Sequence, residues 1–263
     1  MLMLEVEILR LDIPTKTSKR VVDQLAEEKP LNLFVNSIHW ATILCSPLNL
    51  KEMAVGHLLS EGILESAAEI EEVDLKENEN TCIVKVKSEV DVEKRLKLSR
   101  LHARIVTSAC GSGSPYQYNR KPKKAMSKLE VKADVIFNSV NQLNFKAEIF
   151  RKTGGVHAAA ICKADGSLVA LAEDVGRHNA VDKAIGRAAL DQTDFSECFL
   201  ASSGRLSGDI VFKASQVGLP IVASLAAALS SGIEMAKLSN VTLAGFVRGK
   251  RMNIYTFPER IIP

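Results

Sequence analysis

Residues 168–190 read Leu168-Val-Ala-Leu-Ala-Glu-Asp-Val-Gly-Arg-His-Asn-Ala-Val-Asp-Lys-Ala-Ile-Gly-Arg-Ala-Ala-Leu190. The short apolar run 168–172 predicts a strand, and the spacing of apolar residues in 180–190 predicts a helix. Seven residues, most of them polar, separate the two. A strand, a polar junction and a helix in this order are the repeating unit of α/β sheets.

The same alternation extends to both sides of this stretch. We expect strands at 156–162, 168–172, 198–201, 221–223, 241–247 and 252–257, and helices at 133–143, 180–190, 208–217 and 230–238. Short strands that alternate with helices predict a layered α/β sheet for the C-terminal part of the chain.

The first hundred residues follow a different pattern. Residues 4–13 alternate apolar and charged side chains, and the runs 31–35 and 38–45 flank Asn36-Ser37 as a tight hairpin would. A helix over 50–59, a second hairpin at 73–75 and 81–86, and a charged helix from about Val92 follow. We therefore predict a smaller N-terminal α+β domain over 1–106, a loop over 107–128 and an α/β domain over 129–263.

His57 and Glu61 lie one helical turn apart on the helix expected at 50–59. This spacing suits a metal pair, but the sequence offers no further ligand beside them. We interpret them as a surface pair next to a core face.

The composition limits the possible classes of function. The 263 residues are 46% hydrophobic and carry a net charge of +3, so the chain can bury a core, and its mildly basic balance gives no reason to expect a nucleic-acid partner. Five widely spaced cysteines favour a reducing compartment. We find neither a secretory signal nor an apolar run of about 20 residues, so we expect a cytoplasmic protein without a membrane anchor.

The stretch Thr107-Ser-Ala-Cys110-Gly-Ser-Gly-Ser-Pro-Tyr116 consists largely of small turn-forming residues around one cysteine. It predicts a mobile loop that carries a candidate nucleophile, with an incidental linker as the alternative. The basic run Arg120-Lys-Pro-Lys-Lys124 follows, which suits an anionic ligand or an acidic partner, or else is a solvated linker.

Four junctions between predicted elements collect polar groups and glycines. They are Thr153, Gly154 and Gly155 with His157; Glu173, Asp174, Gly176, Arg177, His178 and Asn179; Ser203, Gly204 and Arg205; and Phe246, Val247, Arg248, Gly249, Lys250 and Arg251. Backbone amides and cations at such positions bind phosphates, so we expect an anionic ligand of nucleotide size. Structural roles are the alternatives: a core histidine at 157, a helix cap by Asn179, a bond from Arg177 or His178 to Asp174, and a solvated turn at 248–251.

Several of these motifs resemble one known family. The segments 153–160, 173–180 with Asp182-Lys183, Ser203-Gly-Arg205 and 245–251 through Tyr255 are similar to the formate dehydrogenase accessory sulfurtransferases, FdhD. Glu28-Lys-Pro-Leu31 and the segment 56–63 fit as well, so the resemblance covers nearly the whole chain.

The resemblance implies a C-terminal domain of cytidine-deaminase-like fold, an N-terminal α+β domain and a cytoplasmic homodimer. Members of the family accept persulfide sulfur from a cysteine desulfurase and pass it to the molybdenum of molybdopterin guanine dinucleotide (bis-MGD), before that cofactor enters formate dehydrogenase. Cys110 would carry the sulfur, the turn 246–251 would contact the guanine nucleotide, and the residues of the other junctions would bind the cofactor. We expect no zinc, because Ala158 and Ala159 follow His157 and the deaminase motifs His-x-Glu and Pro-Cys-x-x-Cys are absent.

The chain departs from the family in the cysteine loop. The family pattern is Cys-Gly-x-Cys-Gly, whereas this chain reads Cys110-Gly-Ser-Gly-Ser114 and so keeps one thiol. One thiolate is enough to accept a sulfur atom. The missing cysteine also motivates an alternative, a carrier that delivers the cofactor without handling sulfur. A third possibility is a nucleotide hydrolase with His178 as its base.

Overall fold

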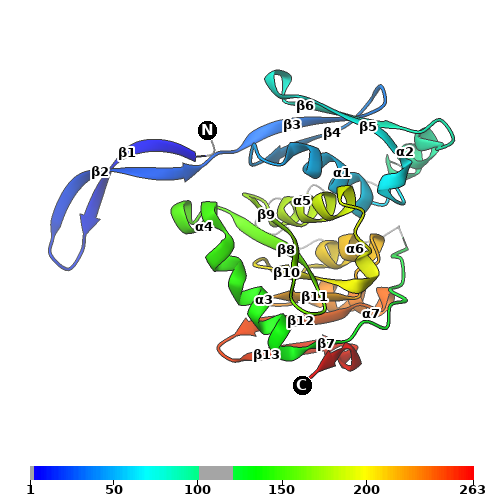
Figure 1. The fold of residues 1–263 in the computed structure, drawn as a ribbon. Helices are drawn as coiled ribbons and strands as arrows, with labels where there is room; N and C mark the ends of the chain where they lie inside the picture. The colour runs from blue at the N-terminus through cyan, green and yellow to red at the C-terminus, as the bar shows by residue number, and fades with distance from the viewer. Residues whose placement is uncertain (1–2, 101–120) are drawn as a thin grey trace.

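The structure is a computed structural model that describes residues 3–100 and 121–263. Two units lie one above the other in Figure 1, and a two-stranded arm projects from the upper one. The upper, N-terminal unit carries a four-stranded sheet, and the lower, C-terminal unit carries a six-stranded sheet. Helices α1 and α5 lie between the two sheets.

The N-terminal unit is the small α+β unit that the sequence predicts. Its sheet has the order β4-β3-β6-β5. Every second residue of β3 is buried, because one face of the sheet packs on α1. Its elements are β3 (Lys29–Val35), β4 (Ile38–Cys45), α1 (Leu50–Ser60), the 3-10 turn η1 (Ala67–Glu69), β5 (Ile70–Lys76), η2 (Glu77–Glu79), β6 (Thr81–Val86) and α2 (Val92–Arg100).

The C-terminal unit confirms the predicted α/β class. Its sheet has the order β13-β12-β11-β10-β8-β9, with α3 on one face and α5 and α6 on the other. Its elements are β7 (Val131–Lys132), α3 (Ala133–Lys146), α4 (Glu148–Thr153), β8 (His157–Lys163), β9 (Leu168–Asp174), α5 (Arg177–Leu190), η3 (Phe195–Glu197), β10 (Cys198–Ser202), α6 (Gly208–Gln216), β11 (Ile221–Ser224), α7 (Ser230–Ser239), β12 (Thr242–Arg248), β13 (Arg251–Thr256), η4 (Pro258–Arg260) and β14 (Ile261–Ile262).

One end of the six-stranded sheet collects the predicted junctions. Strands β10, β11 and β12 are parallel and finish there, at Ser202, Ser224 and Arg248. The antiparallel strand β8 begins at the same end with His157, and β9 returns to finish there at Asp174. We call this end the carboxyl edge, the position at which α/β sheets bind ligands.

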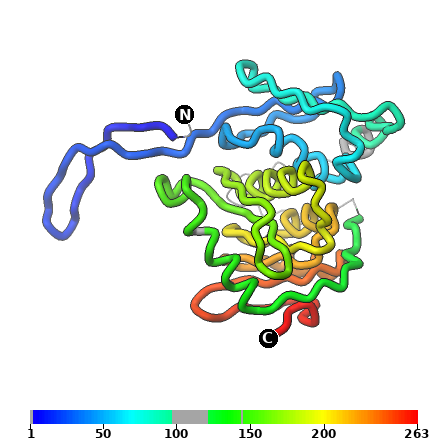
Figure 2. Tube along the Cα trace, in the orientation of Figure 1, coloured from blue at the N-terminus to red at the C-terminus, as the bar shows by residue number. Residues whose placement is uncertain are grey.

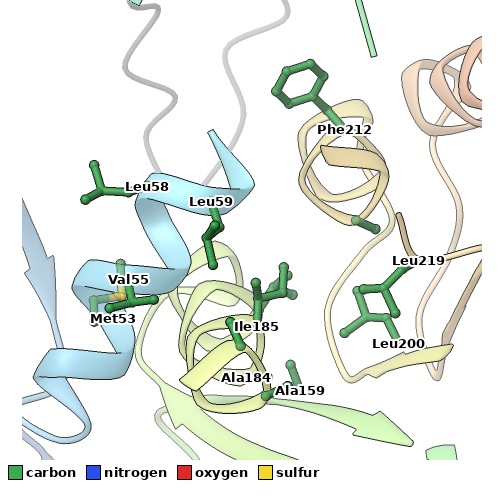
Figure 3. Close-up of a cluster of buried hydrophobic side chains, with 14 of the residues drawn as sticks. Met53, Val55, Leu58, Leu59, Ala159, Ala184, Ile185, Leu200, Phe212 and Leu219 are labelled. Atoms are coloured by element: carbon green, nitrogen blue, oxygen red, sulfur yellow. The ribbon is translucent and has the colours of Figure 1, made fainter. Parts of the chain in front are cut away.

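The two units meet through backbone contact between α1 and α5. A Cβ atom on Gly56 would collide with the carbonyl of Asp182, and one on Gly186 would collide with the carbonyl of Glu52. The absence of side chains at the two glycines lets the helices approach this closely. One buried hydrophobic cluster runs from the N-terminal sheet through α1 and α5 to α6, as the side chains in Figure 3 illustrate.

The arm consists of β1 (Met3–Asp12) and β2 (Thr17–Ala26), paired antiparallel. Figure 2 shows it extending away from both units as a narrow ribbon. Its apolar side chains are exposed, Leu9 and Leu11 by 62% and Ile13 by 79%. The sequence predicts β1 through its alternation. It gives no comparable signal for β2, because Thr17–Ala26 mixes charged and apolar residues without a regular period.

Candidate functional site

A pocket of about 370 Å³ opens at the β8 side of the carboxyl edge. Four of the residues predicted from the sequence line it, namely Gly154, Gly155, His157 and Ser203. The other lining residues are apolar and were not predicted: Phe150, Val156, Val175 and Leu225. Isolated apolar residues of this kind carry no sequence signal for a site. We call this cavity the edge pocket.

Ser203 fixes the polar side of the edge pocket. Its Oγ accepts from the backbone N–H of Ala158 at 3.0 Å and lies 3.3 Å from Nδ1 of His157. Burial, together with the nearby cations Arg177 and Arg205, lowers the pKa of His157. The imidazole is therefore neutral near pH 7 and can accept or donate a hydrogen bond.

Arg177 lies against the loop that follows β10. A Cβ atom on Gly204 would stand 2.9 Å from Cβ of Arg177, so the glycine makes room for the arginine. The loop is held by hydroxyls: Ser202 Oγ accepts from the N–H of Gly204, and Ser224 Oγ donates to the carbonyl of Gly204 at 2.6 Å. Arg205 is exposed next to this loop. The structure thus brings the second and third predicted junctions together beside the edge pocket.

Three residues of the predicted junctions use their polar side-chain atoms for hydrogen bonds within the protein. Glu173 accepts from the backbone N–H groups of Ile149 and Phe150 at the start of α4. Thr153 Oγ1 donates to the carbonyl of Ile149 and accepts from the N–H of Gly155. Asn179 Nδ2 donates to the carbonyl of Leu44 and to Asp174. It does not cap α5, whose N-cap is Gly176.

Asp174 is fully buried and joins the two units. Its carboxylate accepts from the N–H groups of Gly176 and Ser46 and forms an ion pair of 2.6 Å with Lys183 Nζ, which also donates to the carbonyl of Ser46. The structural alternative of a bond from Arg177 or His178 to Asp174 stays a prediction; the partners described here for Asp174 are Ser46, Gly176, Asn179 and Lys183. The role of Asp174 visible here is to fix the start of α5.

The basic turn stands at the β12 end of the carboxyl edge. Gly249 and Lys250 form the turn with φ values of 59° and 62°, and Arg248 pairs with Arg251 across it. This conformation is that of a two-residue hairpin turn, as predicted. The guanidinium of Arg248 lies 5.2 Å from the ring centroid of Phe246, whereas Val247 is buried in the core. Three strand spacings, roughly 14 Å, separate β12 from β8.

His57 and Glu61, predicted to be a surface pair beside a core face, keep 16% and 32% of their side chains exposed. Their charged ends, however, belong to a cluster with buried partners at the contact of α1, α5 and α6. Lys213 Nζ lies 2.9 Å from both Glu61 Oε1 and Asp182 Oδ1, and Asp182 Oδ2 lies 3.1 Å from His57 Nδ1. The sequence does not reveal this cluster, because its members come from three separate helices.

The carboxyl groups of this cluster stay ionised despite their burial. Burial alone would raise the pKa of Glu61, but Lys213 and His57 outweigh it and lower the pKa to about 2. The same balance lowers the pKa of Asp182. Burial likewise opposes the charge of Lys213, and the two carboxylates raise its pKa well above the ordinary value.

His178 is directed toward α6 and does not line the edge pocket. Its Nε2 lies 3.8 Å from Oδ2 of Asp209. Burial, with Lys213 and Arg177 nearby, lowers its pKa to about 4, so the side chain is neutral near pH 7. Its predicted contact with a cofactor stays a prediction, as does the hydrolase role considered for it.

Cys45, Cys82, Cys162 and Cys198 are all buried and unpaired by disulfides. Burial raises the pKa of Cys82 to about 12 and that of each of the other three to about 11. Such thiols are protonated and shielded at neutral pH. Cys110 and the rest of its predicted loop up to Arg120 lie outside the described residues.

Across 3–100 and 121–263, no three histidine, cysteine, aspartate or glutamate side chains gather in a way that could hold a metal ion. Within the same ranges, no helix is long and apolar enough to cross a membrane.

Comparison with known proteins gives a consistent result along the chain. The model of the FdhD/NarQ family matches residues 26–262. A protein named sulfur carrier protein FdhD from Saccharolobus solfataricus is 40% identical over 244 residues, which cover 91% of each chain. A protein of the same name from Methanothermobacter thermautotrophicus is 35% identical over 258 residues, or 98% of each chain.

One solved structure has the same fold. It is described as that of a candidate formate dehydrogenase accessory protein from Desulfotalea psychrophila, and it superposes with a TM-score of 0.78 over the full length of both chains. The two sequences are 23% identical, so this likeness concerns the fold.

Proposed function

Because the chain belongs to the FdhD/NarQ family, we propose that it is a sulfur carrier for the maturation of formate dehydrogenase. In this proposal Cys110 accepts sulfur from a cysteine desulfurase and passes it to bis-MGD, which is the cargo of the protein. The names of the relatives support the sulfur-carrier role. The desulfurase, the persulfide and the bis-MGD are finer steps of our own proposal.

The first step needs one thiolate. Cys110 Sγ attacks the outer sulfur of the desulfurase persulfide, a new S–S bond forms on Cys110, and the desulfurase cysteine leaves as a thiolate. Cys110 is thereby oxidised to a persulfide and the desulfurase cysteine is reduced to a thiolate, so the step needs no external oxidant or reductant. Arg120, Lys121, Lys123 and Lys124 follow Cys110 in the sequence, and such cations would favour the ionised form of the attacking thiol. In the second step the sulfane sulfur leaves Cys110, and its conversion to a sulfide ligand takes two electrons from the metal centre or a thiol reductant.

The observation that carries this assignment is the state of the other cysteines. Four of the five thiols are buried with a pKa of about 11 or 12, so they are poor nucleophiles. Cys110 is the remaining thiol, and it stands among glycines and serines in the sequence. The carrier role therefore depends on this residue.

We further propose that the carboxyl edge binds the nucleotide part of bis-MGD. Arg248, Lys250 and Arg251 would meet the phosphates or the guanine at the β12 end. At the other end, the glycines and Ser203 of the edge pocket offer backbone and hydroxyl groups to the pterin-sized remainder. Edge pocket and basic turn are separated by about the length of a nucleotide.

The arm supports a homodimer. An isolated two-stranded ribbon is marginally stable in water, and this one exposes Leu9, Leu11, Ile13 and Val22 by 62% to 79%. A second copy that covers these side chains would stabilise the arm. We place the protein in the cytoplasm, where thiols stay reduced between transfers.

The sulfur-transfer step is tested by mass spectrometry of the intact protein after incubation with a cysteine desulfurase and cysteine. We expect a gain of one sulfur atom that maps to Cys110 and is lost in Cys110→Ala. The matched controls Cys45→Ala and Cys198→Ala should keep the label, provided that their circular dichroism shows a folded protein.

Formate dehydrogenase activity in cells that carry Cys110→Ala separates the alternatives. Loss of activity supports the sulfur carrier. Full activity would instead mean that the protein delivers the cofactor without handling sulfur. Sulfur that appears equally on Cys45 and Cys198 would contradict both the assignment and the burial argument behind it.

A further inference from the structure

A large groove lies far from the carboxyl edge. It has a volume of about 770 Å³ and lies between β5 of the N-terminal unit and the end of α5. Helix α5 starts at the carboxyl edge with Arg177 and reaches the groove with Leu190, so its 14 residues separate the two sites by roughly 20 Å. None of the predicted site residues lines this groove, which we call the β5 groove.

The β5 groove runs along the free edge of a sheet. Strand β5 stands at the end of the order β4-β3-β6-β5, so in the described part of the chain its outer side pairs with no other strand. Four consecutive residues, 70–73, line the groove. Because neighbouring side chains on a strand point to opposite faces, a groove lined by all four follows the edge of the strand. Such an edge offers unpaired N–H and C=O groups over roughly 13 Å.

The floor of the groove is apolar. Leu59 is buried at its base, and Ile70, Val73, Phe195 and Val217 are half-buried around it. Leu190 stands at the rim with 41% of its surface exposed. These side chains come from both units, so the floor is as rigid as the contact between α1 and α5 that joins them.

The rim is acidic. Glu65, Glu71, Glu72 and Asp194 line the groove, and none of the described lining residues is basic. Glu72 lies 2.6 Å from Lys85 and Glu65 lies 3.6 Å from Arg95 just outside the lining, which offsets part of this charge. Hydrogen bonds from Ser196 lower the pKa of Asp194 and keep it ionised. In a chain with a net charge of +3, an all-acidic rim is a local feature.

We propose that the β5 groove binds an extended segment of a partner protein, in which apolar side chains alternate with lysine or arginine, as an additional strand on β5. Main-chain hydrogen bonds to the edge of β5 would supply affinity. Alternation would turn the apolar side chains toward the floor and bring the cations to the carboxylates of the rim. This docking site goes beyond the sulfur-carrier role and does not depend on it.

The proposal is tested with fluorescein-labelled ten-residue peptides and the full chain, by fluorescence anisotropy at low ionic strength. A peptide of alternating valine and lysine is expected to bind at least about tenfold more tightly than one of alternating valine and glutamate. Glu71→Lys and Asp194→Lys should each weaken binding of the lysine peptide about tenfold. Glu234→Lys on α7, an exposed position that changes the net charge equally, is the matched control and should leave it unchanged.

Strand addition has its own test. The lysine peptide with alternate backbone nitrogens methylated cannot form the ladder along one edge, so we expect its affinity to fall at least about tenfold. Equal binding of the methylated peptide, or equal effects of Glu71→Lys and Glu234→Lys, would overturn the proposal. It would also fall if Leu190→Asp converted a dimer to a monomer in sedimentation velocity, because the groove would then be a contact between copies. Sulfur loading of Cys110 should be normal in Glu71→Lys, which separates the failure of this proposal from that of the carrier role.

Discussion

Lys183 Nζ lies 2.6 Å from Asp174 Oδ2, and neither side chain has any surface exposed to solvent. The pair ties the start of α5 to Ser46, the first residue after β4, since both charged groups also bond to the backbone of that serine. It is thus one of the polar connections between the two units.

Lys183→Met should therefore leave a buried carboxylate without its counter-charge. We expect a loss of about 3–5 kcal/mol in the free energy of unfolding, measured by urea denaturation. Lys85→Met removes the partner of Glu72 in a solvent-exposed pair, whose attraction water screens, and should cost far less. The double variant Lys183→Met with Asp174→Asn should lose less than Lys183→Met alone. If Lys183→Met and Lys85→Met lost the same free energy of unfolding, the burial of the Lys183–Asp174 pair would not be the cause of the loss.

Acid should destabilise the protein in two stages. The pKa of His178 is lowered from 6.5 to about 4, so the unfolded chain binds this proton at a higher pH than the folded one. The contribution of His178 to the free energy of unfolding is therefore fully present above about pH 6.5. It is lost as the pH falls toward 4, by up to roughly 3 kcal/mol. Glu61, with its pKa lowered from 4.5 to about 2, adds a loss between these two values.

His178→Gln checks the first stage. The variant cannot take up the proton, so its free energy of unfolding should change less between pH 6.5 and pH 4 than that of the parent. A smaller slope will remain, because the lowered pKa of His157 acts in the same direction. An unchanged slope would mean that His178 titrates normally in the folded protein.

The basic turn should control nucleotide affinity. Lys250→Ala and Arg251→Ala each remove a cation from the β12 end of the carboxyl edge. A lost charge-assisted hydrogen bond costs about 1.5–3 kcal/mol, so the dissociation constant for guanosine diphosphate should rise roughly 10- to 100-fold. Isothermal titration calorimetry measures this. Lys163→Ala, at the opposite end of β8, is the control. If His157→Ala weakens binding whereas Lys250→Ala and Arg251→Ala do not, the nucleotide occupies the edge pocket instead of the turn.

Charges introduced on the arm should dissociate the homodimer. Leu9→Asp and Leu11→Asp place a carboxylate where a second copy would cover an apolar side chain, at a cost of several kcal/mol. Sedimentation velocity is expected to show monomers. Leu238→Asp changes a residue of similar exposure on α7 and should leave the dimer intact. A parent protein that is monomeric at micromolar concentration would contradict the arm as an interface.

The order of strands and helices could be predicted because it depends on local patterns. The predicted helix over 208–217 is α6 (Gly208–Gln216), and the hairpin at 36–37 follows from an asparagine that tolerates a positive φ. Helix α5 begins three residues before the predicted start. Arg177 and His178 are consequently part of its first turn, because the N-cap is Gly176 and not the polar residue that the pattern favours.

The roles of the junction residues could be predicted only in part. The sequence locates the four junctions, and the strand order brings them to one edge, as α/β sheets do. The sequence alone could not distinguish residues that face a ligand from residues that hold the N-terminal and C-terminal units together. The sequence marks Asp174 and Asn179 as binding groups. In the structure Asp174 bonds to Ser46 and Asn179 bonds to Leu44, both more than a hundred residues away. The other partner of Asp174, Lys183, is fully buried beside it. Such pairing depends on the packing of α1 against α5.

That packing also affects how the chain is made. His57 and Asp182 meet in the cluster between the helices, yet they are 125 residues apart. A ribosome adding about 5–20 residues per second takes roughly 6–25 s to cover that interval. During this time α1 and the sheet above it have no partner for their apolar face. The emerging N-terminal half is thus the stage of synthesis at which we expect this protein to need a chaperone most.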